Sequence, residues 1–216
     1  MKTNMKKLLA IAIFSIVSTS AFAQTSQGSI AISGAFGISK TTQDNAAEIN
    51  QFTVNIAPSV GYFVRDGLEV GAAVGFSHTA ADQLTYDSSG FGTFKTTTNT
   101  FSFVPYITKY FLLSEKVAFT GHAFAGISAG TGKISFDSDF SPNADLKLSG
   151  VQIGVSPGLS FFPTEKIGIS ARFGSLGYTE FSMKPEGGTD SSKSSTFGLD
   201  LNASTLALGF SYYINR

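Results

Sequence analysis

Hydrophobic and polar residues alternate strictly along three stretches in the first half of the chain. Between Gly28 and Ser39, one parity carries isoleucine and phenylalanine, and the other carries serine, alanine and glycine. The same alternation runs from Phe52 to Val64 and from Leu68 to Ser77. A period of two over about ten residues predicts β-strands with two different faces, and these strands are long for a soluble sheet.

Five further segments continue the series with a less regular alternation. They are Asn99–Leu112, Val117–Ser128, Lys147–Phe162, Ile167–Tyr178 and Thr196–Ile214. The fourth strand allows two parities, because Phe101 and Tyr106 lie on opposite faces and either face is apolar enough to meet lipid. The last strand changes parity along its length, which predicts a β-bulge near Ala203–Thr205.

The connections between the eight predicted strands alternate in length. Three are short, namely Arg65–Gly67, Leu113–Lys116 and Pro163–Lys166. Four are long and polar, at about Lys40–Gln51, Thr79–Thr98, Ala129–Leu146 and Thr179–Ser195. Outer-membrane barrels have short periplasmic turns and longer outer loops. The predicted fold is therefore all-β, an eight-stranded antiparallel up-and-down transmembrane β-barrel with periplasmic N- and C-termini.

The first 23 residues have the features of a secretory signal peptide. Three lysines precede an apolar run from Leu8 to Val17, and small residues lead to Ala23. We expect cleavage after Ala23, which leaves a single barrel domain over residues 24–216. Removing the lysines leaves 12 basic and 15 acidic residues, a net charge of −3. This charge is too small to indicate a nucleic-acid partner.

The composition favours a protein that lies in lipid. Only 14 % of the residues are charged, where a soluble domain has about 25 %. After the signal peptide, no apolar run is long enough for a transmembrane helix. A closed barrel is then the structure in which all backbone N–H and C=O groups are hydrogen-bonded within a membrane. The chain has no cysteine, which excludes disulfides and thiolate metal sites.

The two faces of the strands differ in side-chain volume, and this difference predicts their orientation. An eight-stranded barrel is just wide enough for its own side chains, so we expect the glycine, alanine, serine and threonine face inside and the interior filled. The polar residues expected inside are Glu69, Arg172, His122, Asn55 and Gln152. Tyr106 joins them if the fourth strand follows the parity of Phe101. The reverse orientation would be a lipocalin-like soluble carrier, whose surface would lack charge.

A charge inside a narrow barrel should have a partner. We expect Glu69 and Arg172 to interact, directly or through a tyrosine, a glutamine or ordered water, with Asp200 as the competing partner of Arg172. The two histidines, His78 and His122, have no serine in a recognisable catalytic motif nearby. We therefore expect no enzyme, and no catalytic, cofactor-binding or metal-binding residue.

The long connections are the remaining candidates for function. They are rich in serine, threonine, glycine, aspartate and asparagine, with a few aromatic residues such as Tyr86 and Phe136. Their aspartates have no EF-hand spacing. The sequence favours a structural or surface-interaction role with an extracellular ligand bound by the loops. The alternative is a narrow or ligand-specific porin-like channel, and a lipid A-modifying enzyme is less favoured.

Three segments resemble a known family. They are FSFVPYITKYFL (Phe101–Leu112), GVSPGLSFFPTEKIGISARFGSLGY (Gly154–Tyr178) and LGFSYYI (Leu208–Ile214). They resemble the small outer-membrane β-barrel, porin-like family of Gram-negative bacteria, similar to the eight-stranded OmpA/OmpX-type barrels. The resemblance implies an outer-membrane location, contact with outer-membrane lipid and recognition of the last strand by the barrel assembly machinery. Such barrels end on an aromatic residue, whereas Asn215 and Arg216 extend this chain.

Overall fold

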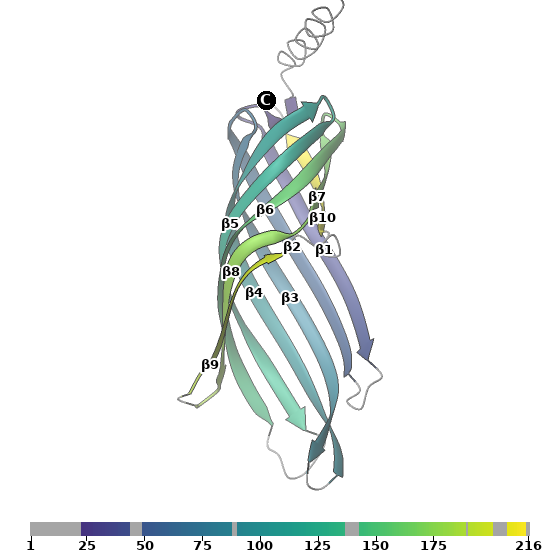
Figure 1. Ribbon diagram of the computed structural model, residues 1–216, viewed down its shortest axis with the longest axis vertical. Helices are drawn as coiled ribbons and strands as arrows, with labels where there is room; N and C mark the ends of the chain where they lie inside the picture. Colours follow the sequence, from purple (N-terminus) through teal and green to yellow (C-terminus); the bar gives the residue numbers. More distant parts are fainter. Residues whose placement is uncertain are drawn as a thin grey trace, which may run out of the picture.

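The computed structural model describes residues 23–43, 49–87, 90–136, 143–188, 190–200 and 207–214. Ten antiparallel strands in these ranges form one sheet (Figure 1). They are β1 (Ile30–Gln43), β2 (Ile49–Arg65), β3 (Leu68–Asp87), β4 (Gly90–Ser114), β5 (Val117–Phe136), β6 (Ala144–Thr164), β7 (Ile167–Arg172), β8 (Ser175–Pro185), β9 (Ser192–Asp200) and β10 (Ala207–Ile214). A short 3-10 helix, Ala23–Thr25, precedes them. The residues that the structure describes include no helix that is long and apolar enough to span a membrane.

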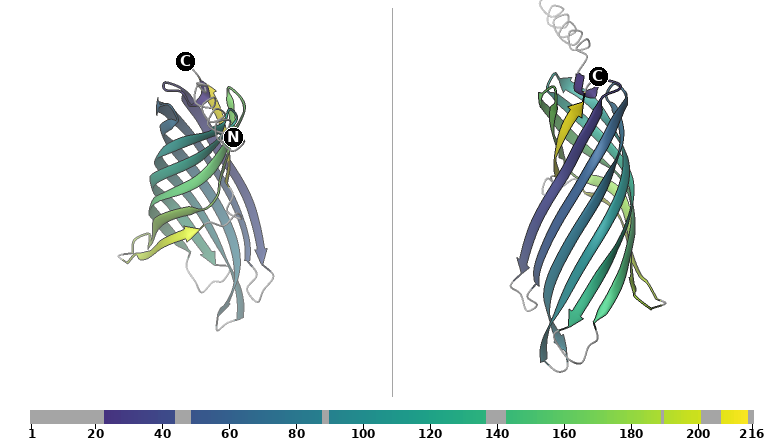
Figure 2. Two further views of the ribbon diagram at one scale, coloured as in Figure 1. Left: turned by 45° about the horizontal axis from the view of Figure 1, so that its top comes forward. Right: turned by 180° about the vertical axis from the view of Figure 1, so that it is seen from behind.

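The sheet closes into a barrel whose wall has eight strands. Two of these wall strands each consist of two strands that follow one another along the chain. β7 and β8 both pair with β6 and together form the seventh wall strand. β10 pairs with β7 and β9 pairs with β8, so these two form the eighth. β1 pairs with β10 and closes the barrel (Figure 2). The predicted eight-stranded antiparallel barrel is confirmed.

The seventh strand is interrupted, so the predicted continuous strand Ile167–Tyr178 is wrong. Gly174 has a φ of 68°, a left-handed conformation that a strand residue does not adopt. Arg172 pairs with Gly158 of β6, while Leu176 pairs with Val155, which shifts the register by one residue. One extra residue in one strand is a β-bulge, which bends the wall at this point.

The described residues of the predicted last strand, Thr196–Ile214, belong to two strands. β9 ends at Asp200 and β10 begins at Ala207. The predicted bulge near Ala203–Thr205 lies outside the described residues. In Figure 1, β8 and β9 curve toward one side while β1 runs toward the other.

The four long connections were predicted too long. β3 and β4 stay paired as far as Asp87 and Gly90, and β5 continues to Phe136. Threonine favours strands, and water satisfies a polar strand face outside the membrane. The polar composition therefore marks where the wall leaves the apolar band, and the strands continue beyond it.

The short turns are where the sequence predicted them. β2, β4 and β6 end at Arg65, Ser114 and Thr164, and each following strand begins within three residues. β1 begins and β10 ends at this same end of the barrel, which we call the turn end (Figure 1). The opposite end carries the long hairpins.

Large hydrophobic side chains cover the outside of the barrel. Those exposed include Val60, Val74, Phe103, Ile107, Ile127 and Ile153. On β6 the exposure alternates residue by residue. Phe101 is 60 % exposed and Tyr106 is 9 % exposed, so the fourth wall strand follows the parity of Phe101. The predicted assignment of the apolar face to the outside is therefore correct.

Candidate functional site

Four aromatic rings close the barrel interior at the turn end. Phe63, Phe162 and Tyr213 are at most 2 % exposed, and Tyr110 packs against them. The Phe63 ring centroid lies 5.5 Å from that of Tyr110 and 6.2 Å from that of Tyr213. Phe162 lies 5.7 Å from Tyr213 and 6.4 Å from Tyr110. We call these four residues the aromatic floor.

The aromatic floor was not predicted from the sequence, because large apolar residues were assigned to lipid. One signal was present in the second predicted strand. Its inward parity carries small or polar residues from Thr53 to Gly61 and then Phe63. A large ring on a small-residue face, next to a predicted turn, predicts a plug at that end of the barrel.

The N-terminal segment covers the aromatic floor from outside. Gly67 N–H donates to the Thr25 carbonyl at 2.8 Å, which fixes the segment to the β2–β3 turn. Gln24 Nε2 donates to the Thr164 carbonyl at 3.3 Å, at the β6–β7 turn across the barrel. Gln24 and Thr25 are 6 % and 2 % exposed. The segment therefore spans the mouth, and we call it the N-terminal cap.

A buried carboxylate lies directly inside the aromatic floor. Glu69 is 3 % exposed. The hydroxyls of Tyr106 and Tyr110 each donate to its carboxylate, at 2.7 Å. A Cβ at Gly61 would collide with the Glu69 side chain, so the small residue leaves room for the larger one. Two hydroxyl donors supply the interactions that a buried carboxylate needs.

Glu69 and Arg172 were expected to interact directly or through an intermediary, and they form no direct ion pair. Among the described residues, ion pairs within 4.0 Å join Lys147 to Glu186 and Lys193 to Glu180. Glu69 takes its hydrogen bonds from tyrosines, a residue type that the sequence had suggested as an intermediary. The side chain of Asp200, the competing partner of Arg172, lies outside the described side chains.

A cavity of about 310 Å³ lies beyond the buried carboxylate. Glu69, His122, Gln152 and Arg172 line it, and Asn55 does not. The structure thus brings four of the five predicted interior residues together. The interior was expected to be filled by side chains. The aromatic floor fills it at the turn end, whereas further along a cavity remains, because the alanine, serine and glycine residues that line it are small.

His122 is held within the wall of the cavity. It is 8 % exposed, and its Nδ1 lies 2.9 Å from Thr108 Oγ1. Its ring packs against that of Tyr106, with the centroids 5.1 Å apart. Glu69 accepts its hydrogen bonds from tyrosines and His122 bonds to a threonine, so the side-chain hydrogen bonds of the described residues do not join His122 to this carboxylate. No group of three or more metal-ligating side chains occurs within the described ranges.

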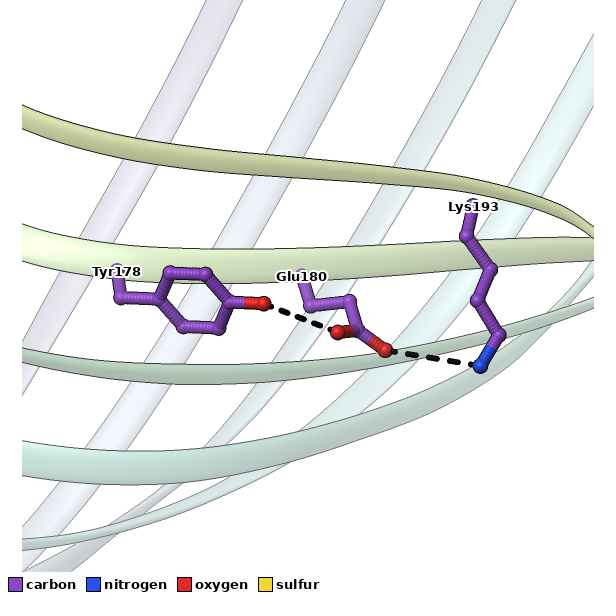
Figure 3. Close-up of polar contacts among 3 residues, drawn as sticks. All are labelled: Tyr178, Glu180 and Lys193. Atoms are coloured by element: carbon purple, nitrogen blue, oxygen red, sulfur yellow. Dashed lines mark hydrogen bonds and ion pairs between the residues drawn. The ribbon is translucent and has the colours of Figure 1, made fainter.

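A polar cluster on the outer face of β8 and β9 marks where the apolar band ends. The Tyr178 hydroxyl donates to Glu180 at 3.0 Å, and Lys193 lies 3.9 Å from the same carboxylate (Figure 3). Tyr178 pairs with Ile153 and Glu180 with Val151, both of which are exposed and apolar. Tyrosine is enriched where a membrane meets water.

A closed barrel with an apolar outer band and a polar interior defines a transmembrane β-barrel protein. The sequence matches the family model of the outer membrane protein beta-barrel domain over residues 9–213. The chain belongs to this family, and it is an outer-membrane β-barrel protein.

Solved structures of outer-membrane proteins have similar folds. OprG from Pseudomonas aeruginosa is 12 % identical, with a TM-score of 0.50, and the match covers 90 % of this chain and 100 % of that one. A major outer membrane protein from Thermus thermophilus is 13 % identical, with a TM-score of 0.43 and coverage of 87 % and 99 %. Neisserial surface protein A is 15 % identical, with a TM-score of 0.37 and coverage of 85 % and 95 %. The comparison with curated proteins found no match.

Proposed function

We propose that this protein is a non-conducting, non-catalytic outer-membrane barrel that acts through its outer surface. The single observation that carries the proposal is the closed turn end. The aromatic floor fills the lumen there, and the N-terminal cap spans it with hydrogen bonds to two turns. A general diffusion pore needs a continuous water-filled path, and eight strands leave little space for one.

The long hairpins support a role at the cell surface. β3 and β4 remain paired through Asp87 and Gly90, which extends the wall beyond the apolar band. A rigid wall that carries polar strands outside the membrane presents a defined surface to an extracellular ligand. In this proposal the hairpins face outward, and both termini and the short turns face the periplasm.

Two further partners belong to this proposal. Outer-membrane lipid contacts the exposed apolar side chains of the barrel, as the family implies. The barrel assembly machinery recognises the last strand, in which Gly209, Tyr212 and Ile214 resemble the terminal-strand signal of such barrels. β10 supports this role, because it is the strand that completes the barrel by pairing with β1.

A narrow or ligand-specific channel is the second candidate, and the cavity favours it. Planar-bilayer conductance tests both functions. We expect no reproducible current steps from the wild-type barrel. The matched variant Phe63→Ala/Phe162→Ala removes half of the aromatic floor, and we expect it to conduct. Stable steps from the wild-type protein would overturn the proposal and favour the channel.

A further inference from the structure

Two lysines and two serines form a square on the outer face of the barrel wall. Lys147 and Ser149 belong to β6, and their pairing partners on β8 are Lys184 and Ser182. Paired residues of antiparallel strands project from the same face and lie about 5 Å apart, and residues two apart along a strand are separated by about 7 Å. The alternating exposure of β6 places this face outside the barrel. We call these four residues the lysine–serine quartet.

The lysine–serine quartet lies just beyond the apolar outer band. Val151 and Ile153 continue the same face of β6, and both are exposed apolar residues of the band. Lys147 is four residues beyond Val151, which is about 10 Å along the barrel axis at 3.3 Å per residue and a 40° tilt. The polar layer on each side of a membrane is about 5–8 Å thick, and a lysine bends its long stem so that its ammonium group reaches that layer. The quartet is therefore at the depth of lipid headgroups.

Acidic residues border the quartet, and each of them lies beside a lysine. The pairs are Lys147–Glu186 at 3.3 Å, Lys193–Glu180 at 3.9 Å (Figure 3), and Lys133–Asp145, which are paired residues of β5 and β6. Lys147 and Lys184 are directly opposite each other, and like charges in that position destabilise a sheet. An anion between these two ammonium groups would remove the repulsion.

A phosphate monoester complements this arrangement of donors. Such a group carries about −1.5 to −2 charges near neutral pH and has three strong acceptor oxygens. The ammonium groups of Lys147 and Lys184 supply charge-assisted hydrogen bonds, and the hydroxyls of Ser149 and Ser182 supply two more donors on the same face. A phosphate diester has a smaller charge and fewer free oxygens, so it uses fewer of these donors.

We propose that the lysine–serine quartet binds the headgroup of a membrane lipid that ends in a phosphate monoester. The acyl chains of this lipid pack on the adjacent apolar band, against side chains such as Val151 and Ile153. The occupant is a lipid, because apolar surface for its chains continues directly from the polar quartet along β6. This headgroup site goes beyond the surface function proposed above, in which the hairpins bind an extracellular ligand.

Phosphatidic acid, whose headgroup is a phosphate monoester, tests the proposal in phosphatidylcholine nanodiscs that hold the full barrel. NMR titration follows the backbone amide signals of Ser149 and Ser182 as the mole fraction of phosphatidic acid rises. We expect these signals to shift and to saturate. Phosphatidylglycerol, a phosphate diester, should need about five times the mole fraction or more for half saturation, because it makes fewer charge-assisted hydrogen bonds.

Two pairs of lysines give matched variants. Lys147→Gln/Lys184→Gln removes both ammonium groups of the quartet and should raise the half-saturating mole fraction of phosphatidic acid about tenfold or more. Lys40→Gln/Lys95→Gln removes the same charge from exposed positions of β1 and β4 whose paired residues are not lysines. It should change the half-saturating mole fraction less than about twofold, because salt screens distant charges. Lys184→Gln alone is the second variant if the first double variant fails to show the heat-modifiable gel mobility of a folded barrel.

Four results would overturn the inference. The first three are the absence of saturable shifts, equal half-saturating mole fractions for the two lipids, and an equal loss of binding in the two double variants. Equal loss would mean that the whole hairpin end attracts anionic lipid without a site. The fourth is the same saturable shift with inorganic phosphate in pure phosphatidylcholine nanodiscs, which would assign the quartet to a free anion. A conducting wild-type barrel would refute the surface function and would leave these binding results unaffected.

Discussion

At the scale of single residues, the side chains of the outer face differ in their depth within the apolar band. Val60 lies near the middle of the apolar positions of β2, whereas Val54 lies two residues from Phe52, which pairs with Lys40. The cost of a lipid-facing lysine falls from the centre of a membrane toward its surface. The depth of each residue therefore has a measurable consequence.

We predict that Val60→Lys lowers the free energy of unfolding by about 2–4 kcal/mol and that Val54→Lys lowers it by about 1 kcal/mol or less. Urea unfolding in lipid vesicles measures both values. Val60→Leu is the control and should be close to neutral. Equal values for the two lysine variants would contradict the depth that the pairing assigns.

The buried carboxylate gives a second prediction at this scale. A double-mutant cycle with Glu69→Gln and Tyr106→Phe should show a coupling of about 1 kcal/mol or more, since the two groups share a 2.7 Å hydrogen bond. The cycle with Glu69→Gln and Arg172→Met should give less than about 0.5 kcal/mol. Unfolding in detergent gives both values. A larger coupling to Arg172 than to Tyr106 would restore the ion pair expected from the sequence.

Sequence reasoning predicted which residues lie inside but not which of them touch. Alternation predicts which side chains share a face, and Glu69, His122, Gln152 and Arg172, which we expected inside, line the cavity. Contacts across the barrel depend on how far neighbouring strands slide past each other, and a period of two carries no information on that shift. The tyrosine partners of Glu69 depend on this register.

At the scale of elements, the break between β7 and β8 depends on one glycine. Gly174 has a φ of 68°, which is strained for any residue with a Cβ. We predict that Gly174→Ala costs about 1–2 kcal/mol of stability. Gly198→Ala on β9 is the matched control, because its Cβ would meet no atom within 4 Å and its φ is not positive. Equal effects would show that the break tolerates a side chain.

The two ends of the barrel give a prediction about orientation. Lys95 is an exposed residue of β4 at the barrel end opposite the turn end, and a cysteine placed there should react with a membrane-impermeant maleimide on intact cells. Cysteines at the turn residues Asp66, Glu115 and Glu165 should react only after the outer membrane is opened. The chain has no cysteine of its own, so labelling is unambiguous. Labelling of the turn positions from outside would reverse the proposed topology.

The element boundaries were the least predictable part of the fold. Short turns were found because hydrophobic strands flank them closely, as at Arg65 and Leu68. Strand ends on the other side were missed, since polar strands outside a membrane have the composition of loops. The break at Gly174 was missed although the apolar parity changes there, from odd positions up to Phe173 to even positions from Leu176 onward. A glycine within a strand is compatible with several local structures, so the residue type alone did not identify the break.

At the scale of the whole molecule, composition and periodicity were sufficient for the fold class. Low charge, long alternating strands and unequal connections define a closed barrel before any contact is known. The cavity was not predicted. Its volume depends on barrel shear and on small side chains from several strands, which meet only when the barrel closes.

The short seam between β1 and β10 determines when folding can finish. Ile30 pairs with Ile214, so the first strand has to wait for the last one. Contacts between distant parts of a chain form slowly, because loop entropy is lost before the contacts stabilise the structure. Hairpins such as β3–β4 are local and form early by the same reasoning. We therefore expect the newly exported chain to remain an incomplete sheet until the five residue pairs of this seam form.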